Sequence, residues 1–253
     1  MLHLDTATIV ILLLSSFVSG FVSTVAGLGG GILVMPALVW AFGVNTGVVI
    51  LSTSMLWGNI VRYLMFREHT DYAVIRKIWL GALIGAAVGA SLLNVAPEVV
   101  LKRCIAGYLV AYVVYEIWGS RLSWSTGLND FPVVGAVTGL LSGMFGVAGP
   151  ISAPFLVNYG LTKERFIATN MLLSLMINAV KAVVYSGGGL LSTNEWIWSG
   201  WAAVFVSLGI WLGAVWLNRI DEAAFKTALL AMLLLVAIDF VFPVEQLFDG
   251  HVS

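Results

Sequence analysis

Two apolar segments of the chain each carry an asparagine that is followed three residues later by a basic residue. One segment contains Asn59 and Arg62, and the other contains Asn178 and Lys181. Polar side chains within membrane-type segments are costly and usually functional. An amide N–H and a cation can both bind an anion, so we expect the two asparagines to line a site. For Arg62 and Lys181 two interpretations stay open: a charge in the pathway, or a side chain that snorkels to the membrane interface.

Two glycine-rich stretches interrupt the apolar sequence, "AGLGGGILVMP" at 26–36 and "SGMFGVAGPISAP" at 142–154. Each glycine costs a helix about 1 kcal/mol relative to alanine, so these runs predict turns of two hairpins. We expect a helix to begin at Gly31 and another at Gly149-Pro150. The free N–H groups and partial positive charge of a helix start form a preorganised anion site. Close helix packing is the alternative, and it is our interpretation of the glycines at spacing four, which are Gly81, Gly85, Gly89, Gly209 and Gly213.

These patterns give a set of candidate site residues. In the second segment polar residues recur at steps of three and four, which is one helical face: Asn170, Ser174, Asn178, Lys181 and Tyr185. The predicted substrate-binding residues are Gly29, Gly30, Gly31, Thr53, Ser54, Asn59, Arg62, Gly146, Gly149, Pro150, Thr169, Asn170, Asn178 and Lys181. Pro36 and Pro154 are predicted to be structural. We expect no catalytic residue, metal site or cofactor.

The composition indicates what must position these residues. Of 253 residues, 60% are hydrophobic and 10% charged, whereas soluble domains carry about 25% charged residues. The chain is therefore predicted to be an all-α polytopic membrane protein in contact with the lipid bilayer. Its net charge of -1 predicts no nucleic-acid partner. Six apolar segments reach the length of about 20 residues that a bilayer requires, namely 46–66, 73–94, 98–119, 162–185, 194–217 and 221–242. The segment 8–26 is expected to stay in the protein and not to be cleaved as a secretory signal. The segments 31–43, 131–145 and 149–159 are too short to span the bilayer comfortably.

The sequence also repeats itself. Residues that match at shifts of 118 to 124 are Gly31 with Gly149, Pro36 with Pro154, Asn59 with Asn178, Arg62 with Lys181, Asn94 with Asn218 and Glu98 with Glu222. Ordered matches of this kind indicate an internal duplication. We predict a first repeat over 1–120, a connector over 121–130 and a second repeat over 131–253, which together form one integral membrane domain.

Basic residues predict the orientation of the repeats, because cytoplasmic loops are enriched in them. If 131–160 is a hairpin, nine of the twelve basic residues share one side. Each repeat is then a broken or re-entrant helical hairpin plus three transmembrane helices. Since three is odd, the repeats are inverted, and both termini lie outside the cytoplasm.

The sequence resembles the TauE/SafE family of bacterial membrane proteins. The likeness rests on a glycine-rich stretch and a proline in each half, followed by "STSM" at 52–55 and "ATNM" at 168–171. The chain departs from an even repeat, because Gly27 lies nine residues before Pro36 while Gly143 lies eleven before Pro154. The resemblance implies a secondary transporter in the bacterial cytoplasmic (inner) membrane that exports sulfite, sulfoacetate or another organosulfonate.

Three functions remain as alternatives at this point. The first is a transporter for a small anion, held near the midplane by the starts of helices 31–43 and 149–159. The second is an anion channel of the same architecture. The third is an intramembrane enzyme with Ser142 as nucleophile, which is disfavoured because the histidines, His3, His69 and His251, lie far from it in the sequence. Open questions are a coupling proton or other ion, a proton relay by Glu116 and Asp239, and a homodimer.

Overall fold

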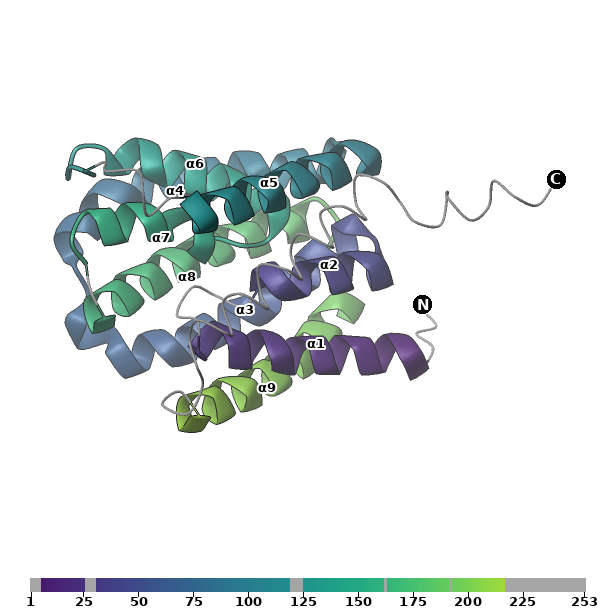
Figure 1. The fold of residues 1–253 in the computed structure, drawn as a ribbon. Helices are drawn as coiled ribbons and strands as arrows, with labels where there is room; N and C mark the ends of the chain where they lie inside the picture. The colour runs from purple at the N-terminus through teal and green to yellow at the C-terminus, as the bar shows by residue number, and fades with distance from the viewer. Residues whose placement is uncertain (1–5, 26–30, 119–124, 162, 192, 217–253) are drawn as a thin grey trace. The chain divides into compact units, whose positions relative to one another are not determined.

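The computed structural model describes residues 6–25, 31–118, 125–161, 163–191 and 193–216. Within these ranges the chain is helical and contains no strand (Figure 1). The helices are α1 (Thr6–Val25), α2 (Gly31–Phe42), α3 (Val44–Phe66), the 3-10 turn η1 (Arg67–His69), α4 (Tyr72–Val95), α5 (Glu98–Trp118), α6 (Phe131–Phe145), α7 (Gly149–Asn158), α8 (Lys163–Gly187) and α9 (Thr193–Trp216).

The predicted all-α polytopic membrane fold is confirmed. Among the described residues, four stretches are long and apolar enough to cross a membrane: Val44–His69, Tyr72–Val95, Glu164–Gly187 and Glu195–Gly213. The predicted span 98–119 forms α5, but this helix is not one of the four. The predicted span 221–242 lies outside the described residues. The segments predicted to be short form α2, α6 and α7.

The break in the second hairpin falls where the glycines predict it. Helix α6 ends at Phe145, and Gly146 then takes φ of 85°, a left-handed conformation that glycine adopts without strain. The N–H of Gly146 donates to the carbonyl oxygen of Ser142. Helix α7 begins at Gly149, with Pro150 in its first turn, where the missing N–H costs no helical bond. The first turn, at 26–30, lies outside the described residues, and α2 is described from Gly31 onward, so the predicted helix start at Gly31 stays a prediction.

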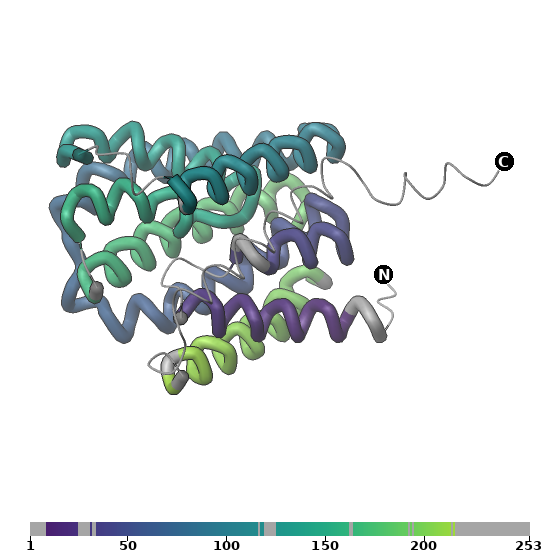
Figure 2. The backbone as a smooth tube through the Cα atoms, viewed as in Figure 1, coloured from purple at the N-terminus to yellow at the C-terminus, as the bar shows by residue number. Residues whose placement is uncertain are grey.

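The glycines at spacing four pack helices together, as predicted. A Cβ built on Gly85 would lie 2.2 Å from the carbonyl oxygen of Ala136, so α4 and α6 meet backbone to backbone. A Cβ on Gly209 would lie 2.1 Å from the carbonyl oxygen of Phe17, which gives α1 and α9 the same contact. Figure 2 shows both pairs side by side.

The packing partners follow the internal repeat. If α1 to α4 correspond to α6 to α9, then the pair α4–α6 corresponds to α9–α1, and α4–α8 corresponds to α9–α3. All four pairs pack in the structure, as do α2–α3 and its counterpart α7–α8. This correspondence supports the duplication, while the inversion of the repeats stays a prediction. These eight helices form one compact unit, and α5 belongs to a second unit.

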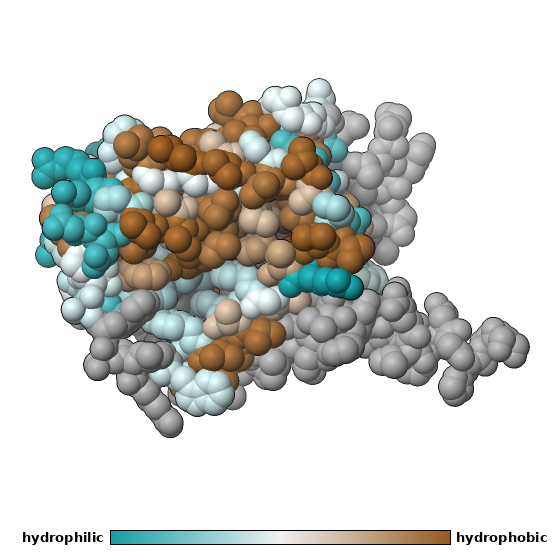
Figure 3. Space-filling view, turned by 90° about the horizontal axis from the view of Figure 1, so that it is seen from above, coloured by the Kyte–Doolittle hydropathy of each residue, from teal (hydrophilic) through white to brown (hydrophobic). Residues whose placement is uncertain are grey.

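Much of the surface is apolar, as a lipid-facing protein requires. Large exposed side chains include Trp40, Trp211 and Val183, which are 70%, 66% and 73% exposed. Figure 3 shows hydrophobic residues across the middle of one face, with hydrophilic residues gathered at its left edge.

Candidate functional site

A small cavity lies where the first described residue of α2 and the second glycine-rich break meet two of the long helices. Its volume is about 20 Å³, which is room for about one water molecule. Its walls come from the start of α2, the turn before α7, and the middle of α3 and α8. The lining residues are Gly31, Met55, Asn59, Gly146, Val147, Ala148, Gly149, Met171, Ser174 and Asn178.

Predicted site residues from the two halves of the chain meet in this cavity. Gly31 and Gly149 are the first residues of α2 and α7, and they are matched by the repeat. Asn59 on α3 and Asn178 on α8 are matched in the same way. The cavity is therefore lined by positions that the predicted repeat pairs with each other, and the first described residue of α2, the start of α7 and two amides surround one space.

Asn178 is poised to bind a ligand there. Its side chain is 3% exposed, and its Oδ1 has no hydrogen-bond partner among the described residues. A buried polar atom without a partner costs about 1–3 kcal/mol. A half turn of the amide exchanges its oxygen for its NH₂ group, so Asn178 can present either an acceptor or a donor to the cavity.

Lys181 lies beside the cavity and does not snorkel in this structure. It is fully buried, and its Nζ donates to the Ser142 carbonyl oxygen at 3.3 Å, Ser142 Oγ at 3.2 Å and the Gly146 carbonyl oxygen at 3.1 Å. An ammonium at the end of α6 satisfies carbonyl groups that the helix leaves unpaired and opposes the negative end of its dipole. One turn further along α8, the hydroxyl of Tyr185 donates to the Gly143 carbonyl oxygen at 2.6 Å.

Arg62 is also buried in the protein, but its contacts differ. The side chain is 5% exposed, and Nη1 lies 3.7 Å from Sδ of the cavity residue Met171. Nε and Nη2 have no hydrogen-bond partner within the described part of the chain. Arginine is always charged in proteins, so a guanidinium with free donors lies directly behind one wall of the cavity.

The other predicted residues lie away from the cavity lining. The Thr53 hydroxyl is hydrogen-bonded to that of Ser199, and the Ser54 hydroxyl bonds within its own helix. Asn170 accepts a bond from Ser152 Oγ at 2.6 Å, which joins α8 to α7. Their assignment to the substrate stays a prediction. The assignment of Pro150, which is buried at the start of α7, also stays a prediction. Pro36 and Pro154 lie inside α2 and α7. Gly29 and Gly30 lie outside the described residues.

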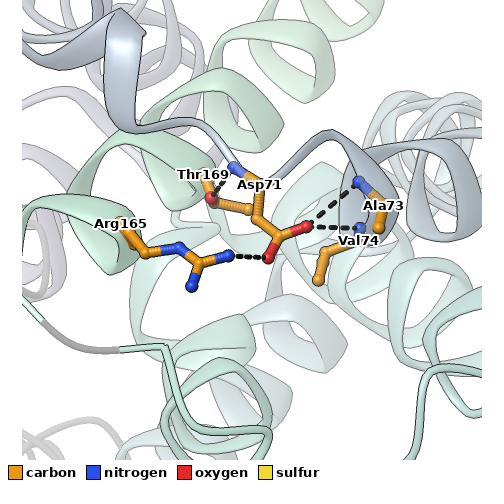
Figure 4. A network of polar contacts seen from close by, with 5 residues as sticks. All are labelled: Asp71, Ala73, Val74, Arg165 and Thr169. Atoms are coloured by element: carbon orange, nitrogen blue, oxygen red, sulfur yellow. Dashed lines mark hydrogen bonds and ion pairs between the residues drawn. The ribbon is translucent and has the colours of Figure 1, made fainter.

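Thr169 belongs to a network at the corner between α3 and α4 (Figure 4). Its hydroxyl accepts a bond from the backbone N–H of Asp71 at 2.9 Å. Asp71 Oδ1 in turn accepts from the N–H groups of Ala73 and Val74 at 3.0 and 3.2 Å, which caps the start of α4. Oδ2 accepts from Arg165 Nη2 at 2.7 Å. The network fixes the start of α8 against the start of α4.

Met55 and Met171 line the cavity and were missed in the sequence. Met55 precedes Asn59 by four residues, and Met171 precedes Asn178 by seven. Both spacings place the methionine on the same helical face as the asparagine. The spacing could have identified both positions. Methionine is not a recognition signal on its own, because it commonly fills gaps in apolar cores.

The geometry weakens the case for an enzyme. Lys181 is the basic group that lies within hydrogen-bond distance of the candidate nucleophile Ser142. Because Lys181 Nζ also lies within hydrogen-bond distance of the Ser142 and Gly146 carbonyl oxygens, these contacts favour the ammonium form, which cannot act as a base. Within the described ranges, no cluster of metal-ligating residues is found.

Comparison with known proteins agrees with these observations. Residues 12–240 match the family model described as the sulfite exporter TauE/SafE. The chain is 26% identical over 157 residues to a probable membrane transporter protein of Methanocaldococcus jannaschii; the match covers 56% of this chain and 58% of that protein. No solved structure matches. Because the family model covers most of the chain, the protein belongs to the TauE/SafE family.

Proposed function

We propose that the protein is a secondary transporter that carries a small sulfur-containing anion, such as sulfite, sulfoacetate or another organosulfonate, out across the bacterial cytoplasmic membrane. The observation that carries the proposal is the cavity itself, in which Gly31 and Gly149 meet Asn59 and Asn178. The family's description as a sulfite exporter and the relative's description as a probable membrane transporter support it. We further propose that the repeats are inverted and that both termini lie outside the cytoplasm.

The chemistry of the cavity suits an anion. Glycine at the first position of α2 and α7 leaves the backbone N–H groups bare, and both helix dipoles place positive charge there. The Oδ1 atom of Asn178 has no partner among the described residues, and a half turn of the amide would present its NH₂ group to the cavity as a donor. Two cations, Arg62 and Lys181, lie next to the walls. Since each component favours negative charge, we infer that the cavity is the anion site.

Entry of the anion requires movement of the walls. An oxyanion of sulfur is larger than the water molecule for which the cavity has room. Met55 and Met171 are the flexible wall residues, because methionine is unbranched and has several rotatable bonds. Their rotation would enlarge the cavity without breaking a helix. This need for rearrangement favours a carrier over an anion channel.

Flux into proteoliposomes tests the proposal. We expect radiolabelled sulfite to enter with saturable kinetics and to show counterflow when unlabelled sulfite is loaded inside, whereas a channel would show neither. A Gly31→Val variant should lower flux, because the new side chain would cover the backbone at the start of α2. It should still fold, since a Cβ on Gly31 would meet the Val147 side chain at an ordinary 3.6 Å.

Gly200→Val is the matched control, because a Cβ on Gly200 would meet open space. Unchanged flux in a well-folded Gly31→Val variant would contradict the assigned site. Absence of flux for every sulfur oxyanion and organosulfonate in the wild type would contradict the proposed function.

A further inference from the structure

Two positive charges are buried beside the cavity without a buried negative charge to balance them. Among the described residues the buried charged side chains are Arg62, Asp71 and Lys181. Asp71 is paired with the exposed Arg165. Neither Arg62 nor Lys181 has a carboxylate partner in the part of the chain that the structure describes. A buried charge is strongly unfavourable unless an opposite charge or hydrogen bonds compensate it.

The contacts of both groups suit a positive charge. The guanidinium of Arg62 does not lose its proton in proteins. Lys181 Nζ lies 3.1 to 3.3 Å from three oxygens, two of which are carbonyl oxygens that only accept, and this environment favours an ammonium. With Lys181 protonated, the described surroundings of the cavity hold two positive charges in addition to the helix dipoles.

Each cation contacts a residue that lines the cavity, without being a lining residue itself. Arg62 contacts Met171, which lines it, and Lys181 bonds to the carbonyl oxygen of Gly146, which also lines it. Each cation also follows a lining asparagine by three residues, so that it lies on nearly the same helical face. The charges thus flank the cavity from α3 and from α8.

We propose that the site is selective for oxyanions that carry two negative charges, with Arg62 and Lys181 as the fixed counter-charges. This rests on the proposed transport function and narrows its substrate class. A monoanion would leave one buried positive charge unbalanced, while a dianion neutralises both. Arg62 supplies the directional contact, because Nε and Nη2 are free and a guanidinium edge matches two oxygens of one oxyanion. Rotation of Met171 brings this edge into the cavity.

Competition between two sulfonates of the same carbon skeleton tests the charge rule. Sulfoacetate carries two negative charges and isethionate carries one. In proteoliposomes that take up radiolabelled sulfite near neutral pH, we expect sulfoacetate to inhibit at a concentration at least about tenfold below that of isethionate, because a second charge pair in a partly buried site is worth at least this factor.

The variants assign the preference to residues. Arg62→Gln should reduce the preference for sulfoacetate over isethionate to about threefold or less. Arg62→Lys keeps the positive charge but loses the planar guanidinium with its paired N–H donors, and it should retain most of the preference. Arg67→Gln is the matched control, because Arg67 is an exposed residue five positions further along the chain. Lys181→Gln provides a second test of the charge count, because the glutamine amide keeps N–H donors near the end of α6.

The possible results separate the two proposals. Equal inhibition by the two sulfonates, stronger inhibition by isethionate, or inhibition by neither would overturn the dianion rule, while saturable sulfite flux would still support the transporter. An unchanged preference in both Arg62→Gln and Lys181→Gln would show that other groups select the charge, and it would also overturn the proposal. If Arg62→Gln fails to insert, the wild-type comparison and Arg62→Lys still decide. Absence of all anion flux refutes the proposed function first.

Discussion

Replacing Asn178 by leucine tests the assignment of the site most directly. The side chain is nearly isosteric, so no void forms, but the amide that faces the cavity is lost. A hydrogen bond to a charged group contributes about 1.5–3 kcal/mol, and 1.4 kcal/mol corresponds to about a tenfold change in affinity. Asn178→Leu should therefore weaken the apparent affinity for the anion by about ten- to a hundredfold.

The same substitution should leave stability intact. In the structure Oδ1 of Asn178 is buried without a partner among the described residues, and removal of such an atom relieves an unfavourable burial. Asn170→Leu makes the opposite change, because Asn170 accepts a bond from Ser152 Oγ at 2.6 Å. Its loss should cost about 1 kcal/mol of stability, while the anion affinity of the folded fraction stays near that of the wild type.

Two measurements on the purified proteins distinguish these outcomes. Thermal denaturation in detergent reports stability, and concentration-dependent counterflow reports affinity. Asn59→Leu should resemble Asn178→Leu, because Asn59 also lines the cavity. A less stable Asn178→Leu protein with unchanged affinity would refute the reasoning, since the asparagine would then be a packing residue of α8.

Three further outcomes follow from the contacts. Gly139→Leu should prevent stable folding, because a Cβ there would lie 2.1 Å from a backbone oxygen of α4, whereas Gly200→Leu should be tolerated; the amount of monodisperse protein after detergent extraction measures both. Lys181→Met should lower the thermal stability by about 1.5–3 kcal/mol, because the ammonium bonds at the end of α6 are lost. Asp71→Ala should cost about 1–2 kcal/mol through loss of the cap of α4, and Arg165→Ala less than about 1 kcal/mol, because that arginine is 61% exposed; equal thermal shifts in the two variants would contradict this order.

The sequence predicted those features that depend on local chemistry. Glycine and proline impose their conformational preferences within a few residues, so the start of α7 at Gly149 was predicted correctly. The packing role of Gly85 and Gly209 was also predicted, because spacing four places small residues on one helical face. The span boundaries of α3, α4, α8 and α9 followed from the length of the apolar runs.

Features that depend on contacts between distant segments were not predictable. A lysine near the end of an apolar helix has the same local sequence whether it snorkels or turns inward. Only the position of the end of α6 beside α8 shows that Lys181 bonds to Ser142 and Gly146. Likewise, the sequence of α8 does not show that Asn178 faces a cavity while Asn170 faces Ser152, eight residues earlier on the same helix.

The exchange of partners between the two halves explains how one cavity comes to contain residues from both. The fourth helix of each half packs against the first helix of the other half, as α4 does with α6 and α9 with α1. Glycines bring these backbones into contact, so each pair behaves as a closely packed unit. Helices α3 and α8 pack against each other between the two pairs and bear the two asparagines. If the pairs move relative to α3 and α8, the starts of α2 and α7 shift around fixed amides, and this would change access to the anion without unfolding a helix.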